Sequence, residues 1–291
     1  MTSVVSIQSA VAYGHAGNSS AVFALQRTGV EVWPVHTVNF SNHTGYGSWR
    51  GKAIPAEEVW DIVLGIDERG ALENTDALLC GYLGTPEVGR VILDAAELIR
   101  GRNPQAVFCA DPVMGDVDTG FYAAPGIPEF WRDHVVPAAD IMTPNLFELQ
   151  FLTGRTTTTL DEVVAAAQEL RRRGPDVVLV TSVVGADMGP DAMRLLAVGP
   201  GGVWLVETPV LERKFTGSGD VTTALFLARW LRSGDLADAL QATASAIYSL
   251  LEATSAADQA ELRLVPAQDD LVDPRFTFRA VRLDETQSSG T

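Results

Sequence analysis

Basic residues are scarce in this sequence, and their scarcity limits the partners that the chain can bind. The 291 residues include 21 Lys and Arg against 37 Asp and Glu, which gives a formal net charge of −16 at pH 7. The one basic run, Arg171 to Arg173, is expected to end a helix. No general affinity for nucleic acid or for an anionic membrane is therefore expected. If the protein handles phosphates, local positive potential must come from backbone amides or a bound divalent cation.

Cysteine and long apolar runs are also scarce. Cys80 and Cys109 are the only cysteines, and each lies beside a short apolar run, which favours buried thiols in a reducing cytoplasm over a disulfide or a metal pair. No run of about 18 uncharged apolar residues occurs, and the N-terminus lacks the basic segment and apolar core of a signal peptide. We therefore expect a cytoplasmic protein.

Several common catalytic motifs are absent. The sequence contains no G-x-x-x-x-G-K-[ST] loop, no kinase-type H-R-D or D-F-G signature and no G-x-S-x-G elbow. The four histidines do not have the close spacing of metal ligands. His36 and His134 are expected to be structural, whereas His15 and His43 lie in polar loops, where His43 can serve either loop packing or contact with a small aromatic ligand.

Short apolar runs alternate with helical patterns along most of the chain. This alternation predicts an α/β fold, a doubly wound and mainly parallel central sheet with helices on both faces. The segment Thr159 to Glu162 (TLDE) predicts a capping box, and Gly174 follows the basic run as a helix stop. No linker or repeat divides the pattern, so we expect a single domain over residues 1–283 and a flexible tail over residues 284–291.

Polar clusters lie at the expected strand-to-helix junctions, and in a doubly wound sheet such junctions converge on one edge. The segment TGSGD places Asp220 behind Gly217 and Gly219 and ahead of an apolar helix. The amides of Gly217, Ser218 and Gly219 can hold an anion at the helix start, while Asp220 accepts a proton from a hydroxyl. The alternative is that Asp220 only caps the helix. The other clusters are SAVAYGHAGN, FSNHTGYG, DPVMGD and TPNLFE.

Asp111 and Glu148 are carboxylates that follow two of the expected strands without an obvious partner lysine. Two acidic side chains beside a phosphate site suit Mg²⁺, which prefers oxygen ligands and bridges to phosphates. The alternative is that both are turn or cap residues. Asp116, in GDVDTG, is typical of a turn.

Together these motifs resemble the pyridoxal kinases of the ribokinase-like superfamily, from about Val5 to Leu283. The motifs that carry the resemblance are SIQSAVAYGHAGN, WPVHTVNFSNHTGYG, GYLG, DPVMGD, TPNLFE and TGSGD. The resemblance implies ATP-dependent phosphorylation of the 5′-hydroxyl of pyridoxal to pyridoxal 5′-phosphate. It also implies a homodimer and Mg²⁺, commonly with a monovalent cation.

The resemblance also assigns roles to individual positions. Asp220 would be the general base, with Gly217, Ser218 and Gly219 as the anion hole. On the vitamin side, Ser9 would hydrogen-bond the pyridine ring, Thr44 and Gly45 would line the pocket, and Tyr82 would pack on the ligand. The nucleotide side would take Asp111, Thr143 and Glu148 at ATP or its metal, Thr181 and Ser182 near the phosphates, and Thr208, Pro209, Val210 and Leu211 beside the adenine.

Two departures from the family pattern matter. Some bacterial members carry a cysteine in the lid after DPVMG that can add to the aldehyde of pyridoxal, whereas this chain has Phe121 and Tyr122 there. Covalent capture by that loop is therefore not expected, although residues 116–126 should still act as a flap. Thr181 replaces a lysine of some relatives, so charge compensation must depend on Mg²⁺ and amides.

Other functions also fit the motifs. A hydroxymethylpyrimidine kinase of the same superfamily would act on a similar planar ring with a hydroxymethyl group. A sugar kinase usually adds a small β-sheet lid, and no inserted polar strand pair is visible between Ser9 and Asp76. A non-catalytic vitamin B6-binding protein would not need the clusters assigned to the metal-nucleotide site. The sequence does not identify the dimer face, for which apolar surface on the helices around Val11 to Leu25 or Trp49 to Leu64 is a candidate.

Overall fold

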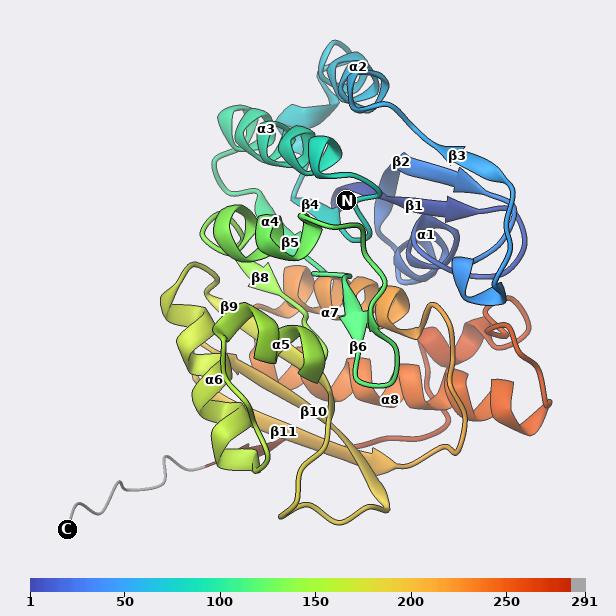
Figure 1. The fold of residues 1–291 in the computed structure, drawn as a ribbon, viewed down its shortest axis with the longest axis vertical. Coiled ribbons are helices and arrows are strands. Elements are labelled where there is room, and N and C mark those ends of the chain that lie inside the picture. Colours follow the sequence, from blue (N-terminus) through green and yellow to red (C-terminus); the bar gives the residue numbers. More distant parts are fainter. Residues whose placement is uncertain (284–291) are drawn as a thin grey trace.

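One ten-stranded sheet runs through the computed structural model, which describes residues 1–283 (Figure 1). The strand order is β12-β11-β10-β9-β8-β5-β4-β1-β2-β3. The tail predicted for residues 284–291 lies outside the described residues. The strands of the sheet are β1 (Ser3–Val11), β2 (Glu31–Phe40), β3 (Gly51–Ala53), β4 (Ala77–Cys80), β5 (Val107–Ala110), β8 (Ile141–Met142), β9 (Val177–Val183), β10 (Ala192–Gly199), β11 (Gly202–Pro209) and β12 (Val281–Leu283).

The central strands are parallel, as predicted. β2, β1, β4, β5, β8 and β9 pair in parallel, and β4 and β5, for example, pair from Ala77 with Val107 to Cys80 with Ala110. All nine residues of β1 are buried, which is expected of a parallel strand covered on both faces. The edges are antiparallel, through β10, β11 and β12 on one side and β3 on the other.

Helices cover both faces of the sheet, and each face has its own apolar core (Figure 1). One core includes residues of α2 (Ala56–Asp67), α3 (Pro86–Arg102), α4 (Ile127–Phe130), α5 (Leu146–Thr153) and α6 (Leu160–Arg172). The other includes residues of α1 (Asn18–Arg27), α7 (Ser218–Ser233) and α8 (Leu236–Ala256). The predicted doubly wound α/β fold is confirmed. None of the helices in the described part of the chain is both long and apolar enough to cross a membrane.

Helix termini follow the signals in the sequence. Thr159 and Glu162 form the predicted capping box of α6, and that helix ends at Arg172, within the basic run. α7 begins at Ser218, two residues before Asp220, so the prediction that a helix starts near Asp220 is confirmed. The short helical turns η1 (Thr44–Tyr46), η2 (Ala71–Asn74), η3 (Trp131–Val135) and η4 (Gln268–Leu271) complete the helical elements.

A separate two-stranded hairpin stands over the carboxyl edge of the sheet. It pairs β6 (Gly115–Asp116) with β7 (Gly120–Phe121) in antiparallel fashion. The sequence predicted a flap over residues 116–126, but not that it contains strands. Asp116, predicted as a turn residue, ends β6 and accepts a hydrogen bond from the amide of Val117.

Candidate active site

The polar clusters predicted from the sequence meet where β1, β5 and β8 end and α7 begins. Side-chain oxygens of Thr143 and Thr223 lie 2.8 Å apart, and Thr223 donates to Asp111 over 3.1 Å. On the other side of the α7 start, the amide of Gly17 donates to Asp220 over 2.8 Å. Residues separated by more than 200 positions are thus brought to one edge of the sheet, where a parallel fold presents its ligand site.

Asp220 faces the loop after β1 instead of closing its own helix. The N-cap of α7 is Gly217, and no side chain caps this helix. Oδ2 of Asp220 accepts the Gly17 amide instead, so the alternative that Asp220 only caps α7 does not describe this structure. Burial raises the pKa of Asp220 to about 6, against the lowering effect of the Gly17 hydrogen bond. At neutral pH the side chain is therefore mostly an ionised carboxylate that can accept a proton.

The start of α7 packs closely against the loop after β1. Gly217 has φ +80°, and a Cβ on it would lie 1.8 Å from the carbonyl oxygen of His15. Only glycine fits at this approach. Ser218 already donates its amide to Phe215 over 3.3 Å and its hydroxyl to the same carbonyl over 2.8 Å. The amides of Gly219 and Asp220 have no acceptor among the described residues, so they are the freer donors for an anion.

Asp111 is a buried carboxylate with room for a further partner. It lies just after β5, and only Oδ2 accepts a side-chain hydrogen bond, from Thr223, among the residues that the structure describes. Burial is the main cause that raises its pKa well above the ordinary value, and the charges of Glu148 and Asp220 raise it further. These charges also indicate that the three carboxylates share one region.

The sequence left open whether Glu148 is a cap residue or a metal ligand, and its position in the structure is compatible with both roles. It is the third residue of α5 and completes a capping box, because Oε2 accepts the Asn145 amide over 2.9 Å and Asn145 caps the Glu148 amide. Its other oxygen accepts the Met114 amide over 3.0 Å. The residue is nevertheless buried beside Asp111, and burial raises its pKa despite the amide donors.

The electrostatics of Asp111 and Glu148 fit a divalent cation. Two buried carboxylates with raised pKa values repel each other, and a cation bound between phosphate and carboxylate oxygens would relieve both effects. In the described residues no cluster of three or more His, Cys, Asp and Glu side chains is placed to hold a metal. Two carboxylates can suit Mg²⁺, which commonly uses one or two of them together with water and substrate phosphates.

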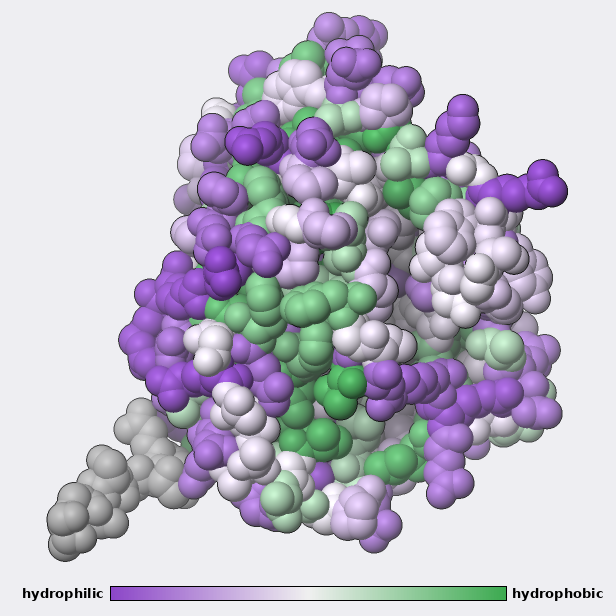
Figure 2. Space-filling view, in the orientation of Figure 1, coloured by the Kyte–Doolittle hydropathy of each residue, from purple (hydrophilic) through white to green (hydrophobic). Residues whose placement is uncertain are grey.

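The β6–β7 hairpin covers the acidic residues from one side. Phe121 packs edge-on against Phe147 and Phe151 of α5, with ring centres 5.0 and 5.1 Å away. Burial, then the charges of Glu148, Asp111 and Asp220, raise the pKa of Tyr122, so its phenol lies near all three carboxylates. At the hairpin turn Asp118 pairs with Lys214, which precedes the TGSGD segment. Figure 2 shows this face hollowed between the apolar surface over the hairpin and α5 and the loops after β1 and β2.

The residues assigned to the vitamin lie in β1, in η1 after β2, and in the loop after β4. Ser9 is buried against Gly17, because a Cβ on Gly17 would lie 2.3 Å from the Ser9 hydroxyl. Thr44 and Gly45 form η1, whose N-cap His43 accepts the Gly45 amide over 3.0 Å. The carbonyl of Tyr82 accepts the Thr37 hydroxyl over 2.9 Å, which holds the GYLG loop at the end of β2.

The other residues assigned to the nucleotide lie at the same sheet edge, but fewer hydrogen bonds join them to the rest of the site. The Thr181 amide donates to Pro144 over 2.9 Å, which ties β9 to the TPNLFE segment. Ser182 follows with φ +55°, a conformation that non-glycine residues seldom adopt. Thr208 and Pro209 end β11, and Val210 and Leu211 follow it. No hydrogen bond within residues 1–283 joins these four residues to Asp111, Glu148 or Asp220.

Sequence reasoning missed four residues that build the site. Thr223 could have been found, because it follows Asp220 by three positions and so shares its helix face. Gly17 and Tyr122 lay in quoted segments without a role assigned to their amide or phenol. Glu261 follows α8 in a segment with no recognised motif, and only the fold brings it to the His15 amide, which it accepts over 3.0 Å.

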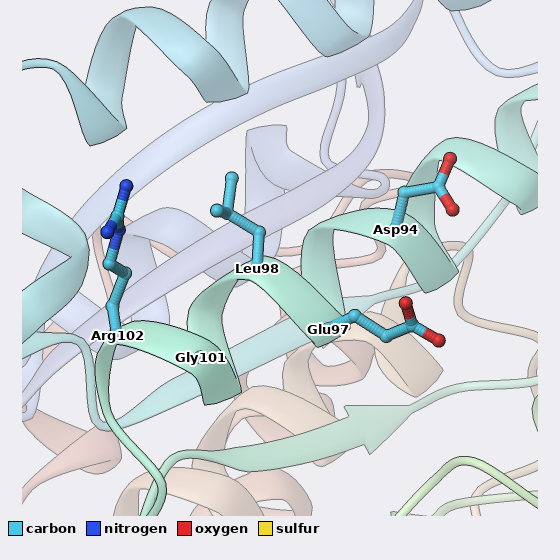
Figure 3. Close-up of a pocket in the computed structure, with 5 residues that line it drawn as sticks. All are labelled: Asp94, Glu97, Leu98, Gly101 and Arg102. Carbon is cyan, nitrogen blue, oxygen red and sulfur yellow. The ribbon is translucent and has the colours of Figure 1, made fainter.

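A surface depression on α3 lies apart from this site. A shallow cavity of about 420 Å³ lies on the outer side of α3 and is lined by Asp94, Glu97, Leu98, Gly101 and Arg102 (Figure 3). These residues occupy the second half of α3, whereas the acidic residues lie beyond the carboxyl ends of the strands. Nothing in that depression adds to the chemistry described above.

Comparison with known proteins places the whole chain among vitamin kinases. The sequence profile of the phosphomethylpyrimidine kinase family matches residues 73–263. A pyridoxal kinase PdxY of Leifsonia xyli is 50% identical over 280 residues, which cover 96% of this chain and 99% of the relative. A pyridoxal kinase PdxY of Corynebacterium diphtheriae is 51% identical over 284 residues, covering 96% and 99%.

Solved structures agree with the sequence comparison. The pyridoxal kinase of Leishmania donovani in complex with ADP and ginkgotoxin matches with a TM-score of 0.90 and 30% identity, covering 97% of this chain and 100% of that one. The same kinase with ADP and pyridoxamine matches with a TM-score of 0.89 and 28% identity, with the same coverage. Because curated pyridoxal kinases share about half of their residues with it over nearly its entire length, the chain belongs to the pyridoxal kinase family.

Proposed function

We propose that this protein transfers the γ-phosphoryl group of ATP to the 5′-hydroxyl of pyridoxal and releases pyridoxal 5′-phosphate and ADP. The observation that carries the proposal is Asp220. It stands at the start of α7 with a pKa of about 6, next to amides that have no acceptor in the described chain. A base and an anion site are thus adjacent, as phosphoryl transfer to an alcohol requires.

In the proposed reaction Asp220 accepts the proton of the 5′-hydroxyl as its oxygen attacks the γ-phosphorus. The bond between that phosphorus and the bridging oxygen of ADP breaks, and ADP leaves with the electron pair. The amides of Gly219 and Asp220, with Gly217 beneath them, face the charge that develops on the transferring group. Ser218 contributes to the anion site mainly by holding the backbone turn before α7, since its amide and hydroxyl already donate to the carbonyl of Phe215.

Asp111 and Glu148 are the residues that would hold Mg²⁺. When bound, the ion would supply positive charge to the phosphate oxygens, which this acidic chain otherwise lacks. Thr143 and Thr223 hold Asp111 in place through their hydroxyls. Thr181, Ser182 and the segment Thr208 to Leu211 are proposed to contact the nucleotide.

The hairpin is proposed to act as the flap that excludes water from the phosphates. The phenol of Tyr122 lies near the three carboxylates, and Phe121 anchors the hairpin on α5. Neither side chain can form the covalent adduct with an aldehyde that a cysteine could form. The vitamin is proposed to lie between Ser9, Thr44, Gly45 and Tyr82, with its hydroxymethyl group toward Asp220.

Phosphorylation of hydroxymethylpyrimidine is the second candidate, and the matching family profile favours it. That profile spans residues 73–263 and omits the loops after β1 and β2. The curated pyridoxal kinases match over 96% of the chain, including those loops. Ser9 in β1, and Thr44 and Gly45 in the loop after β2, also lie outside the profile. The vitamin side of the site therefore favours pyridoxal.

Steady-state kinetics with pyridoxal, pyridoxine and hydroxymethylpyrimidine test the proposal. We expect the highest kcat/KM with pyridoxal, because discrimination depends on contacts to the ring. A higher kcat/KM for the pyrimidine would overturn the substrate assignment. If Mg-ATP does not bind in calorimetry, the chain is instead a vitamin binder without catalysis.

The cellular setting is part of the proposal. Cys80 and Cys109 are free and buried, and burial raises the pKa of both thiols, so they suit a reducing cytoplasm. We also propose a homodimer, as in the resemblance described above.

A further inference from the structure

One carboxylate from a distant part of the chain joins the loops on the vitamin side. Oε2 of Glu261 accepts the amide of His15 over 3.0 Å, and Oε1 accepts the hydroxyl of Tyr46 over 2.5 Å. His15 belongs to the loop after β1, and Tyr46 ends η1 in the loop after β2. The two loops are thus bridged by a residue that neither contains.

The loop after β1 is shaped to receive this carboxylate. Gly14 has φ +88°, and a Cβ on it would lie 2.3 Å from Oε2 of Glu261. Any other residue at this position would displace the Glu261 side chain or the loop backbone. In the segment YGHAGN, the first glycine, Gly14, therefore leaves room for the Glu261 carboxylate. The amide of the second glycine, Gly17, donates to Asp220.

The same short loop reaches the catalytic base. Two residues beyond His15, the Gly17 amide donates to Asp220 over 2.8 Å, and the His15 carbonyl lies against Gly217. A continuous path of contacts therefore runs from Tyr46 through Glu261 and the loop to Asp220. A shift of this loop would move the Gly17 amide, which donates to Asp220, and would also change the shape of the proposed vitamin pocket.

Ionisable and polar groups surround both ends of this path. Around Glu261 lie His15, His43 and the Tyr46 phenol, and Tyr13 packs edge-on against Tyr46 at 6.2 Å. The Nδ1 atom of His15 is buried without a hydrogen-bond partner in the described chain. Around Asp220 lie the Gly17 amide, Asp111 and the Tyr122 phenol.

We propose that Glu261 is a positioning residue that couples closure of the vitamin pocket to the orientation of Asp220. It does so by holding the His15 amide and the Tyr46 hydroxyl at once. The inference rests on the proposed function, since it assumes that η1 covers the vitamin and that Asp220 is the base. It adds to that function a residue that touches neither reacting atom.

Three substitutions separate the two ends of the path. Glu261→Ala removes both contacts, Tyr46→Phe removes only the contact to η1, and Glu261→Gln keeps one acceptor oxygen. Glu97→Ala is the matched control, because Glu97 is exposed on α3, far along the chain from both loops (Figure 3). Each variant is compared with wild type in thermal midpoint, in kcat and KM for both substrates, and in the pH dependence of kcat/KM for pyridoxal.

For Tyr46→Phe we expect a rise in KM for pyridoxal of about tenfold with little change in kcat. For Glu261→Ala we expect the same rise together with a fall in kcat of about tenfold or more, at an unchanged KM for ATP. The acid limb of its pH profile should move to higher pH, because the Gly17 hydrogen bond lowers the pKa of Asp220 and would be weakened. Glu261→Gln should recover part of the loss.

Wild-type constants and pH profile in Glu261→Ala would overturn the inference. A general loss of function would also overturn it. In that case kcat and both KM values would change, the thermal midpoint would fall, and the acid limb of the pH profile would not move. If Glu261→Ala does not fold, Glu261→Gln and Tyr46→Phe carry the test, because Tyr46→Phe should change only KM for pyridoxal whereas Glu261→Gln should also lower kcat. Failure of the proposed function is distinct, because wild-type protein would then not phosphorylate pyridoxal at all.

Discussion

At the scale of single residues, Asp220 is the group on which the proposed chemistry depends. The residue as a whole is half-buried, its carboxylate receives one backbone hydrogen bond, and burial of that group raises its pKa to about 6. A base with a pKa just below neutral is ionised in use yet still basic enough to take a proton. Asp111 and Glu148 are more deeply buried, which suits charge binding more than proton transfer.

The raised pKa of Asp220 predicts an acid limb in the activity profile. A base must be ionised to act, so kcat/KM for pyridoxal should be constant above the pKa and fall as the pH drops through about 6. The slope should approach about tenfold per pH unit. Initial rates across a pH series at constant ionic strength measure this. An acid limb near pH 4, the ordinary range of an aspartate, would contradict the burial of the base.

The burial of Asp111 and Glu148, together with the charge of Glu148 beside Asp111, predicts an unusual effect on stability. Both pKa values are raised in the folded protein, so stability should fall as the pH rises above the ordinary carboxyl pKa values of about 4. In metal-free protein at pH 8, Asp111→Asn should raise the thermal midpoint by about 2 °C or more, as roughly 1 kcal/mol would in a chain of this size. The gain should shrink toward pH 4.

Differential scanning fluorimetry with a chelator measures this effect, and Asp94→Asn on the exposed side of α3 is the control. A lowered midpoint for Asp111→Asn at pH 8 would mean that the hydrogen bond from Thr223 outweighs the repulsion. The same variant should lose most of its activity with Mg-ATP.

The sequence was informative about residues whose chemistry lies in a local motif. Asp220 behind two glycines, and Asp111 and Glu148 after strands, were selected by residue type and position. The partners that define their geometry were not selected, because the Gly17 amide and the Glu261 carboxylate act through contacts made only by the fold. The spacing of residues within a motif gives no information about contacts between residues more than 200 positions apart.

At the scale of elements, strand direction was the least predictable property. Strands β10 and β11 lie in apolar runs, but alternation alone does not distinguish a parallel from an antiparallel pair. The segment Gly199 to Gly202 did contain the signal, since so short a glycine-rich connection permits only a hairpin. Strands β3, β6, β7 and β12 have two or three residues, too few for any periodic pattern.

Packing of the hairpin on α5 predicts how strongly the proposed flap contributes to nucleotide binding. Phe121→Ala removes the edge contacts to Phe147 and Phe151. Such aromatic contacts are worth about 0.5–1.5 kcal/mol, so KM for ATP should rise about two- to tenfold while KM for pyridoxal stays unchanged. Val117→Ala, at the exposed hairpin turn, is the control for a change elsewhere in the flap. Equal effects of the two variants on KM for ATP would argue against this anchoring.

At the scale of the whole molecule, one sheet connects residues from β1 to β12, and we propose that residues 1–283 fold as a single domain. Helix α8 was not named in the prediction, yet it packs on α7 and closes one core. Fold class was predictable because it depends on the succession of elements. The role of α8 was not predictable, because it depends on packing between segments that are distant in the sequence.

The exposed apolar residues predict where a second copy binds. Of the two candidate faces, the segment Trp49 to Leu64 is favoured, because Trp49 and Ile62 are 47% and 45% exposed and the edge strand β3 lies between them. Analytical ultracentrifugation should give the mass of a dimer for wild type and of a monomer for Ile62→Glu. Glu97→Ala should remain dimeric. A wild-type monomer at micromolar concentration would contradict the proposed assembly.

The most direct measurement is the turnover of Asp220→Asn. The side chain keeps its size and can still accept the Gly17 amide, so the thermal midpoint and the KM values should stay near those of wild type. Loss of the base should lower kcat by on the order of 10²-fold or more. If the purified, folded variant phosphorylates pyridoxal at close to the wild-type rate, Asp220 is not the base.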